Sequence, residues 1–363
     1  MRIALVLYCG IRFGGAERRL IRVASEIAKE HDVYLVARGC TPSHLKESLD
    51  LSECSTSNLK GVVAIQSKSR YWENMQVLLY LRKLNVEIAH VIDACGFNSV
   101  LALWMHVLGK TVMLTVANGL YFYDYERGCT NRNLEFVLPR ADVLDVLYPD
   151  QEKFYRDRAS NGCMVGVTPG TFTDLELFQP MKKEKTFVFL AARLEKLKNP
   201  QLMIDAVRQC AGVLRSEGYR VLICGRGWEE ESIREQVAIQ KLDDIVEMPG
   251  YVNSKEVLPK AAVLCALQSL SNYPSQTIAE AAASGCFVIA TDVGETYRLI
   301  DPDYSIAIEP TSDALATAMR DYIFLTEEEK LRFVSSSCNY AKSHFSISPS
   351  VEYFRSLYER CKP

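Results

Sequence analysis

Paired cysteines are absent from this sequence. Its twelve cysteines are scattered singly, without a Cys-x-x-Cys pair, and its five histidines form no metal-ligand cluster with them. Several of the thiols stand in apolar, strand-like runs such as VLICG. This spacing excludes a disulfide framework and a cysteine-rich zinc site, and it is typical of free thiols in a reducing compartment.

Long hydrophobic runs and an excess of positive charge are also missing. No run approaches the roughly 20 apolar residues of a membrane-spanning helix, and the opening MRIALVLYCG is too short for a signal peptide. The formal net charge of −3 excludes a global attraction to nucleic acid. We therefore expect a cytoplasmic protein without nucleic-acid partners. A peripheral contact with the inner membrane face is compatible with these observations.

The composition is that of a globular protein with more than one core. The chain has 363 residues, of which 48% are hydrophobic and 24% are charged. This length exceeds the size of a single ordinary core, so two domains are expected.

Strand-like and helix-like segments alternate along the chain. The strand-like runs of the first half are RIALVLY, DVYLVAR, IAHVIDA, TVMLTVA and VLDVLYP. After the polar stretch at 167–185 the pattern starts again with TFVFLAA, YRVLICG, IVEMPGYV, VLCALQS and CFVIATD. Such alternation predicts parallel sheets covered by helices. We predict α/β domains over 1–172 and 173–345, and a final helix in 346–363 that can pack back on the first.

The architecture itself predicts where a ligand binds. Open parallel sheets bind ligands at the carboxyl ends of their strands. Two such domains facing each other form a cleft, which is the usual place for a small-molecule site.

A glycine pair follows the first strand. Gly14 and Gly15 open the first helix, where a backbone without side chains can approach a ligand and helix N–H groups can bind an anion. A plain strand-to-helix turn explains the pair equally well. The spacing is not the Gly-x-Gly-x-x-Gly of a dinucleotide site, which argues against a dehydrogenase.

Two cations follow the first strand of the second half. Arg193 and Lys198 stand in AARLEKLKNPQ, where they are expected to point into the cleft and bind phosphate. The alternative is a solvated basic loop, which is our interpretation of Lys196.

The stretch SNYPSQTIAEAAASGCFVIATDVGET, residues 271–296, contains the strongest site signal. Gln276, Thr277 and Ile278 fall on the first turn of a short helix, so their N–H groups can bind phosphate oxygens. Glu280 is suited to accept hydrogen bonds from the vicinal hydroxyls of a sugar. Taken without context, the better explanation is an ordinary glutamate favoured near a helix start by the dipole.

Taken together, these segments resemble one family. GGAERRL, VTPGTFTDLELFQP, AARLEKLKNPQLMIDA, LICGRGWEEESI, IVEMPGYVNSKEV and AEAAASGCFVIATDVGE are similar, in this order, to motifs of retaining glycosyltransferases of family 4, the glycosyl transferases group 1. The resemblance covers nearly the whole chain. It implies the GT-B fold, in which two Rossmann-like domains with parallel sheets face each other across a cleft.

The resemblance also implies roles for individual residues. Arg193 and Lys198 would neutralise the donor diphosphate, and Glu280 would hold the ribose hydroxyls. The other residues implied to bind the donor are Gly14, Gly15, Gly225, Gly227, Gly250, Val252, Gln276 and Thr277.

The sequence departs from the family pattern on the sugar side. The family has an acidic residue eight positions before the ribose glutamate, where this chain has Asn272, or Ser271 if the loop is one residue longer. Its His-Gly is replaced by Asn118-Gly119. Acceptor contacts are expected around Asp93, Asn118 and Tyr121. Aromatic residues of ANGLYFYDYERG pack on sugar or lipid, or form an ordinary surface loop.

The resulting hypothesis is a retaining glycosyltransferase of polysaccharide biosynthesis. It would move a sugar from a UDP- or GDP-type donor to a hydroxyl of a glycan, a lipid-linked sugar or a small molecule. No cofactor and no metal are expected, since no Asp-x-Asp stands in a suitable loop. The alternatives are a weakly active or inactive glycosyltransferase-like protein that binds nucleotide sugar or a partner, and a GT-B sugar-nucleotide epimerase.

Overall fold

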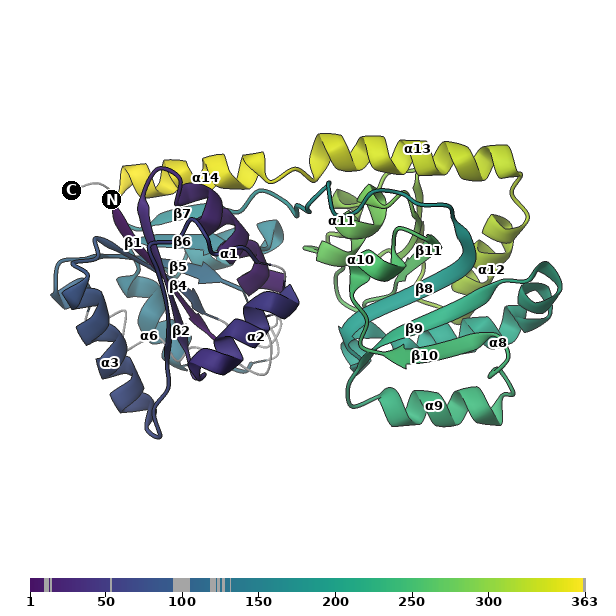
Figure 1. Ribbon diagram of the computed structural model, residues 1–363, viewed down its shortest axis with the longest axis horizontal. Helices are drawn as coiled ribbons and strands as arrows, with labels where there is room; N and C mark the ends of the chain where they lie inside the picture. Colours follow the sequence, from purple (N-terminus) through teal and green to yellow (C-terminus); the bar gives the residue numbers. More distant parts are fainter. Residues whose placement is uncertain are drawn as a thin grey trace. The chain divides into compact units, whose positions relative to one another are not determined.

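The computed structural model divides the chain into two compact units (Figure 1). Unit 1 comprises Met1–Pro169 and Ser348–Pro363, and unit 2 comprises Gly170–Ile347. The sequence prediction had set the corresponding boundaries at 172/173 and 345/346. The residues that the structure describes are 1–9, 13, 15–52, 54–93, 105–117, 122, 125, 128–130 and 132–361.

Unit 1 contains a seven-stranded sheet in the order β3-β2-β1-β4-β5-β6-β7. Its strands are β1 (Arg2–Tyr8), β2 (Asp32–Arg38), β3 (Gly61–Ile65), β4 (Ile88–Asp93), β5 (Thr111–Val116), β6 (Val143–Val146) and β7 (Met164–Val167). The described helices of this unit are α1 (Gly15–Ile27), α2 (Pro42–Ser52), α3 (Arg70–Lys83), α6 (Arg132–Val137), α7 (Glu152–Arg156) and α14 (Ser348–Arg360), with short 3-10 turns η1 (Leu138–Arg140) and η2 (Pro149–Gln151).

Unit 2 contains a six-stranded sheet in the order β10-β9-β8-β11-β12-β13. Its strands are β8 (Glu184–Arg193), β9 (Arg220–Arg226), β10 (Val246–Gly250), β11 (Ala261–Ala266), β12 (Phe287–Thr291) and β13 (Ser305–Ile308). Its helices are α8 (Pro200–Glu217), α9 (Glu230–Ile239), α10 (Ser254–Val257), α11 (Gln276–Ala283), α12 (Ser312–Ile323) and α13 (Glu327–His344), with 3-10 turns η3 (Lys196–Lys198) and η4 (Thr296–Arg298).

Both sheets have the Rossmann-like strand order. Every strand pair is parallel, and in each sheet the first strand lies in the middle with the next two on one side and the later ones on the other. The prediction of two parallel-sheet Rossmann-like domains is confirmed. The order reverses between β1 and β4 in unit 1 and between β8 and β11 in unit 2, and ligands of such sheets bind at the carboxyl ends beside that reversal.

Helices bury both faces of the unit 2 sheet, as β8 illustrates. Phe187 and Phe189 pack into one core with Met203 of α8, whereas Val188 packs into a second core with Ile278 of α11. A strand covered on both faces must be apolar at successive positions, which explains the run TFVFLAA.

The last helix, α14, is attached to unit 1 by a buried polar network. His90 Nδ1 lies 2.6 Å from the Tyr358 hydroxyl, and its Nε2 lies 2.7 Å from Thr115 Oγ1. Thr115 donates to Asp145 Oδ2 at 2.7 Å, and Tyr353 donates to Asp145 Oδ1 at 2.8 Å. Because Thr115 uses its proton on Asp145, His90 Nε2–H donates to Thr115. Burial lowers the pKa of His90, so the imidazole is neutral and its Nδ1 accepts from Tyr358.

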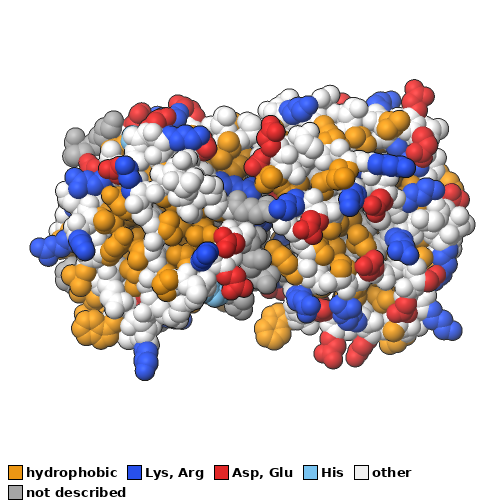
Figure 2. Space-filling model, viewed as in Figure 1, with side chains coloured by type: hydrophobic (Ala, Val, Ile, Leu, Met, Phe, Trp, Pro, Cys, Tyr) orange, Lys and Arg blue, Asp and Glu red, His pale blue; other side chains and the backbone are white. Residues whose placement is uncertain are grey.

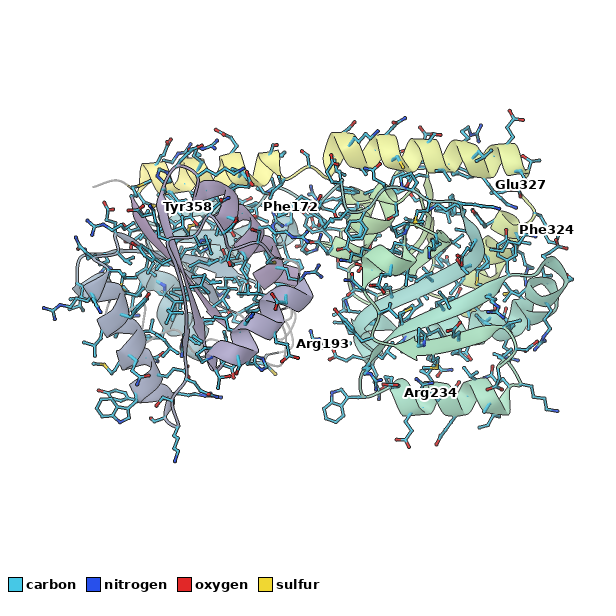
Figure 3. All side chains as sticks on the ribbon, in the orientation of Figure 1. Phe172, Arg193, Arg234, Phe324, Glu327 and Tyr358 are labelled. Carbon is cyan, nitrogen blue, oxygen red and sulfur yellow. The ribbon has the colours of Figure 1, made fainter. Side chains whose placement is uncertain are left out.

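A second attachment of α14 runs through Arg19 on α1. Its Nη2 donates to Thr168 Oγ1 at 3.2 Å, to the Pro169 carbonyl at 2.5 Å and to Ser350 Oγ at 3.0 Å. The first residues of α14 are thereby bonded to the end of unit 1's preceding segment. Tyr358, near the other end of the helix, is labelled in Figure 3.

Acid should destabilise unit 1 through His90. Burial lowers the pKa of His90 to about 3, against roughly 6.5 in an unfolded chain. Since the unfolded state binds a proton that the folded state excludes, the contribution is complete above pH ~6.5 and is lost as the pH falls toward 3. Urea unfolding measured across this range should show a loss of about 1.4 kcal/mol per pH unit from this group.

The variant His90→Gln should lack this part of the pH dependence and should lose about 1–3 kcal/mol at neutral pH through its broken hydrogen bonds. His106→Gln, at an exposed position of the same unit, is the control and should keep the dependence. An unchanged acid slope in His90→Gln would assign the effect to other groups.

Candidate functional site

The reversal point of the unit 2 sheet carries the two predicted cations. Arg193 is the last residue of β8, with a side chain 77% exposed, and its Nη1 lies 3.4 Å from Glu195 Oε1 (Figure 3). Lys198 ends η3, the next turn of the chain. The exposed Lys196 between them fits the solvated residue predicted at that position.

Lys198 is in an environment that disfavours its charge. Burial lowers the pKa of the Lys198 ammonium, the neighbouring Arg193 guanidinium lowers it further, and Glu195 only partly opposes them. No hydrogen bond of its Nζ is found among the residues that the structure describes. A desolvated ammonium beside a second cation is stabilised by an anion, and a diphosphate supplies several anionic oxygens.

Gly225 and Gly227, which the resemblance implies to bind the donor, pack closely against the backbone at and after the end of β8. A Cβ at Gly225 would lie 1.8 Å from the Ala191 carbonyl oxygen, and one at Gly227 would lie 2.4 Å from that of Leu194. In the same contact, the Leu194 N–H donates to the Arg226 carbonyl at 2.9 Å. The end of β9 thus packs directly on the loop after β8. These glycines position the loop of Arg193 and Lys198.

Gly250 and Val252 also contact the protein itself. A Cβ at Gly250, whose φ is +80°, would lie 3.2 Å from the Arg226 guanidinium. Val252 packs partly buried against the core on the α11 side of the sheet. The described structure therefore supports a packing role for both residues, and their donor contact stays a prediction.

The N-terminus of α11 lies at the next strand end. Ser275 is the N-cap, and its hydroxyl accepts from the Ile278 N–H at 3.2 Å. Ile278, expected to offer its N–H to phosphate, is therefore already capped. The N–H groups of Gln276 and Thr277 have no acceptor one turn earlier in the helix. The Gln276 side chain donates to the Phe172 carbonyl at 2.9 Å, so only its backbone suits the predicted phosphate contact.

Direct hydrogen bonds join the cation loop to the loop before α11. The backbone N–H of Ser269 donates to the Leu197 carbonyl at 3.0 Å, and the Ser269 hydroxyl donates to the same oxygen at 3.2 Å. The structure thus brings η3 and the segment leading to α11 together at one edge of the sheet.

Asn272, predicted to contact the donor sugar, forms hydrogen bonds inside unit 2. Its side chain is 1% exposed, and its Nδ2 donates to the Thr291 carbonyl at 3.3 Å and to Thr296 Oγ1 at 3.1 Å. The amide hydrogens are used inside unit 2, where they hold the loop against the turn after β12. An aspartate here would set a carboxylate oxygen against the Thr291 carbonyl.

Two buried carboxylates lie near this loop. Glu280, in the middle of α11, is 2% exposed. Glu295, which sequence reasoning missed, is 6% exposed, and its backbone N–H donates to Ser271 Oγ at 3.3 Å. Its Oε1 accepts from Arg298 Nε at 2.6 Å, while its Oε2 is buried without a bond from the described residues. The available signal was its place: Glu295 ends the segment AEAAASGCFVIATDVGE, whose counterpart in the resembled family ends in Gly-Gly.

Most of the predicted unit 1 residues cannot be placed. Three of them lie outside the described residues: Gly14, Asn118 and Tyr121. Asp93 is the last residue of β4, and only its backbone is described. Gly15 begins α1, and a Cβ there would meet open space.

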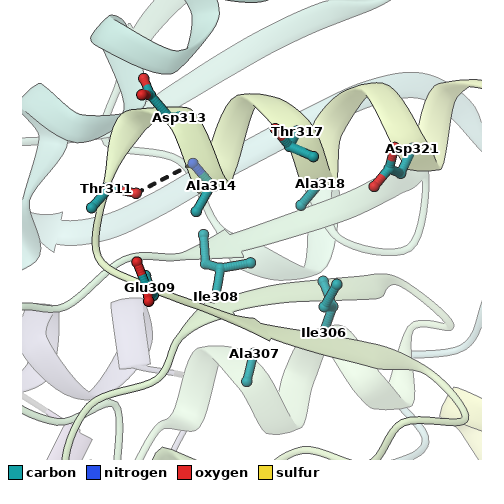
Figure 4. Close-up of a pocket in the computed structure, with 10 residues that line it drawn as sticks. All are labelled: Ile306, Ala307, Ile308, Glu309, Thr311, Asp313, Ala314, Thr317, Ala318 and Asp321. Carbon is teal, nitrogen blue, oxygen red and sulfur yellow. Dashed lines mark hydrogen bonds between the residues drawn. The ribbon is translucent and has the colours of Figure 1, made fainter.

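A groove of about 650 Å³ lies away from these residues, between β13 and α12 (Figure 4). Its lining includes the carboxylates of Glu309, Asp313 and Asp321. Three acids repel a diphosphate, so this groove does not fit a nucleotide donor.

The described part of the chain contains neither a cluster of metal ligands nor a membrane-spanning helix. No group of three or more His, Cys, Asp or Glu side chains there could hold a metal ion. No described helix combines the length and apolar composition required to cross a bilayer.

Comparison with known proteins relates the chain to glycosyltransferases. Residues 184–323 match the family profile of glycosyl transferases group 1. The whole chain is 22% identical to the GalNAc-alpha-(1->4)-GalNAc-alpha-(1->3)-diNAcBac-PP-undecaprenol alpha-1,4-N-acetyl-D-galactosaminyltransferase of Campylobacter jejuni and covers 99% of it. Over 144 residues, 37% of the chain and 34% of the relative, it is 32% identical to the putative colanic acid biosynthesis glycosyltransferase WcaL of Escherichia coli.

The fold has solved counterparts. The structure of Anabaena Alr3699/HepE in complex with UDP superposes with a TM-score of 0.78, at 15% identity, over 99% of this chain and 100% of that one. Residues 184–323 thus belong to the glycosyl transferases group 1 family, and the chain is a glycosyltransferase of the GT-B fold.

Proposed function

We propose that this chain transfers a sugar from a UDP- or GDP-linked donor to a hydroxyl acceptor, with retention of anomeric configuration. One observation carries the proposal: the exposed Arg193 at the end of β8 and the desolvated Lys198 of η3 flank a turn that is hydrogen-bonded to the segment leading into α11. Cations and a helix N-terminus together suit a diphosphate. The structural relative from Anabaena, solved with UDP, supports a nucleotide donor.

The main chemical task is to stabilise the departing diphosphate. As the bond between the anomeric carbon and the phosphate oxygen breaks, negative charge grows on that oxygen. Arg193, Lys198 and the first N–H groups of α11 stabilise this charge. The acceptor hydroxyl attacks the same face of the sugar and gives its proton to a phosphate oxygen. This route needs no protein nucleophile, no cofactor and no metal ion.

We further propose a lipid-linked glycan as the acceptor and a cytoplasmic protein that works at the inner membrane face. The relative from Campylobacter jejuni is named for a glycan on undecaprenyl diphosphate and matches this chain from end to end. An acceptor of that type is embedded in a membrane. We also propose a place in polysaccharide biosynthesis, supported by the Escherichia coli relative that is named for colanic acid biosynthesis.

We assign the sugar-side carboxylate to Glu295 in place of the residue missing at 272. The Glu295 backbone is bonded to Ser271, the loop position that precedes Asn272. Its buried Oε2 is an acceptor without a donor among the described residues, and a sugar hydroxyl would supply one. Glu280, one turn inside α11, keeps the predicted ribose contact.

Loss of either cation should weaken diphosphate binding. Arg193→Ala and Lys198→Ala each remove a charge-assisted contact of about 1.5–3 kcal/mol, which is roughly a 10- to 150-fold rise in Kd. Calorimetric titration with UDP and GDP measures this. Lys196→Ala removes an exposed cation of the same loop and should bind as the wild type does. Wild-type affinity in both site variants would place the diphosphate elsewhere.

Transfer should persist when divalent metals are removed. Release of UDP or GDP from a panel of their sugars, in the presence of a lipid-linked acceptor, should continue in EDTA because two cations and a helix N-terminus take the place of a metal. Activity that disappears in EDTA and returns only with Mg²⁺ or Mn²⁺ would contradict the metal-free route. Nucleotide binding without release from any sugar would contradict transfer itself.

The nucleotide and sugar ends of the donor should respond to different variants. Glu280→Gln should weaken binding of the free nucleotide and of its sugars alike. Glu295→Gln should leave the free nucleotide unaffected and change the ranking among nucleotide sugars. Equal loss of free nucleotide in both variants would contradict this division.

Asn272→Asp provides the structural comparison. It should lower the melting temperature, because it replaces a buried donor by an acceptor and so costs about 1–3 kcal/mol. An unchanged melting temperature would show that the amide hydrogens are not needed inside unit 2.

A further inference from the structure

Helix α3 of unit 1 has an apolar outer face that the protein does not bury. Trp72 is 62% exposed and Leu79 is 60% exposed, and their spacing of seven residues places them on one side of the helix. Tyr71, beside them, is 59% exposed. The opposite side is buried through Val77 and Leu81. The helix is therefore already held on unit 1, and its outer side chains add nothing to that core.

The same surface is basic. Segment 66–85 contains four exposed cations: Lys68, Arg70, Arg82 and Lys83. Its one acid, Glu73, is buried against Arg38, whose Nη2 lies 3.2 Å from Glu73 Oε1. The outer face of α3 thus carries positive charge without an exposed carboxylate, on a chain whose net charge is −3.

A neighbouring segment with further exposed apolar side chains lies beside one end of this surface. Lys110 Nζ donates to Asn85 Oδ1 at 3.3 Å, which places the segment 105–110 beside the C-terminal end of α3. In that segment Val107 is 66% exposed and Leu108 is 42% exposed. Figure 2 shows hydrophobic and basic side chains gathered over the part of unit 1 where α3 lies.

We propose that the outer face of α3, with segment 105–110, is the surface through which this chain contacts an anionic lipid bilayer. Tryptophan and tyrosine favour the membrane interface, and lysine and arginine are drawn to anionic headgroups. A second copy of the chain fits less well, because a two-fold contact through this face would set two basic surfaces against each other without an exposed carboxylate of α3 to pair with them.

The location of α3 suits the lipid-linked acceptor proposed above. The membrane-surface proposal rests on that proposed function. The chain passes from the carboxyl end of β3 into α3, so Trp72 in the first turn lies toward the sheet edge at which β4 ends with Asp93. Ligands of a parallel sheet bind at that edge. An acceptor whose lipid stays in the bilayer could then present its sugar to unit 1 without leaving the membrane.

Vesicle flotation of the full chain tests the surface. The protein should float with vesicles of equal parts phosphatidylglycerol and phosphatidylcholine, and much less with phosphatidylcholine alone. Trp72→Ala with Leu79→Ala should lower the partition coefficient by about tenfold or more. Arg82→Gln with Lys83→Gln should lower it roughly 25-fold at low salt, at about fivefold for each charge.

Matched controls lie on unit 2. Phe324 and Leu331 are 67% and 66% exposed, so their double alanine variant removes similar apolar surface elsewhere and should bind vesicles as the wild type does. Circular dichroism of each variant checks that it folds.

Three outcomes would overturn the inference: vesicle binding that the α3 variants retain, equal loss of vesicle binding in the unit 2 control, or a wild-type dimer in sedimentation that Trp72→Ala with Leu79→Ala dissociates.

Donor hydrolysis in free solution separates this proposal from the proposed function. If the enzyme releases nucleotide but does not bind vesicles, only the proposed membrane surface is contradicted. If it binds vesicles but releases no nucleotide, only the proposed reaction is contradicted.

Discussion

The site depends on one close contact between backbones. The end of β9 lies so near the loop after β8 that a Cβ at Gly225 or Gly227 would strike a carbonyl oxygen of Ala191 or Leu194. This contact fixes the direction in which the chain leaves β8, and so holds two like charges at one strand end. Their repulsion and the desolvation of the lysine destabilise the free protein locally. A bound diphosphate would offset both effects, which makes this edge selective for a polyanion.

Sequence patterns predicted the strands at the centre of each sheet and missed most of those at the edges. A strand such as β12 is buried at every residue, and its apolar run is visible in the sequence. Edge strands are short and half exposed. Three of them, β3, β7 and β13, lack a continuous buried pattern and were not foreseen. Helices α12 and α13 were missed as well, although α13 begins with a capping box at Thr326.

The local sequence of the candidate site residues does not show what each of them packs against. Local sequence does not distinguish a glycine that lets a ligand approach the backbone from a glycine that lets another strand approach it. Only the fold shows that Gly225 and Gly227 face the chain itself. Asn272 poses the same problem, since its partners Thr291 and Thr296 are 19 and 24 residues away. Glu295 was missed because the family motif has glycine at that position. The motif therefore predicts no role for a glutamate there.

The net charge of the whole chain hides an uneven distribution. Positive charge gathers at the end of β8 and on the outer face of α3, while the groove beside α12 is acidic. Both positive regions suit phosphate, one as a donor diphosphate and the other as lipid headgroups. A metal ion could neutralise a phosphate at the end of β8. It could not do so along a membrane, where mobile headgroups are bound by many separate cations. Separate lysine and arginine side chains can bind phosphate at both places. Each side chain binds its phosphate directly, and none requires the fixed set of ligands that a metal ion does.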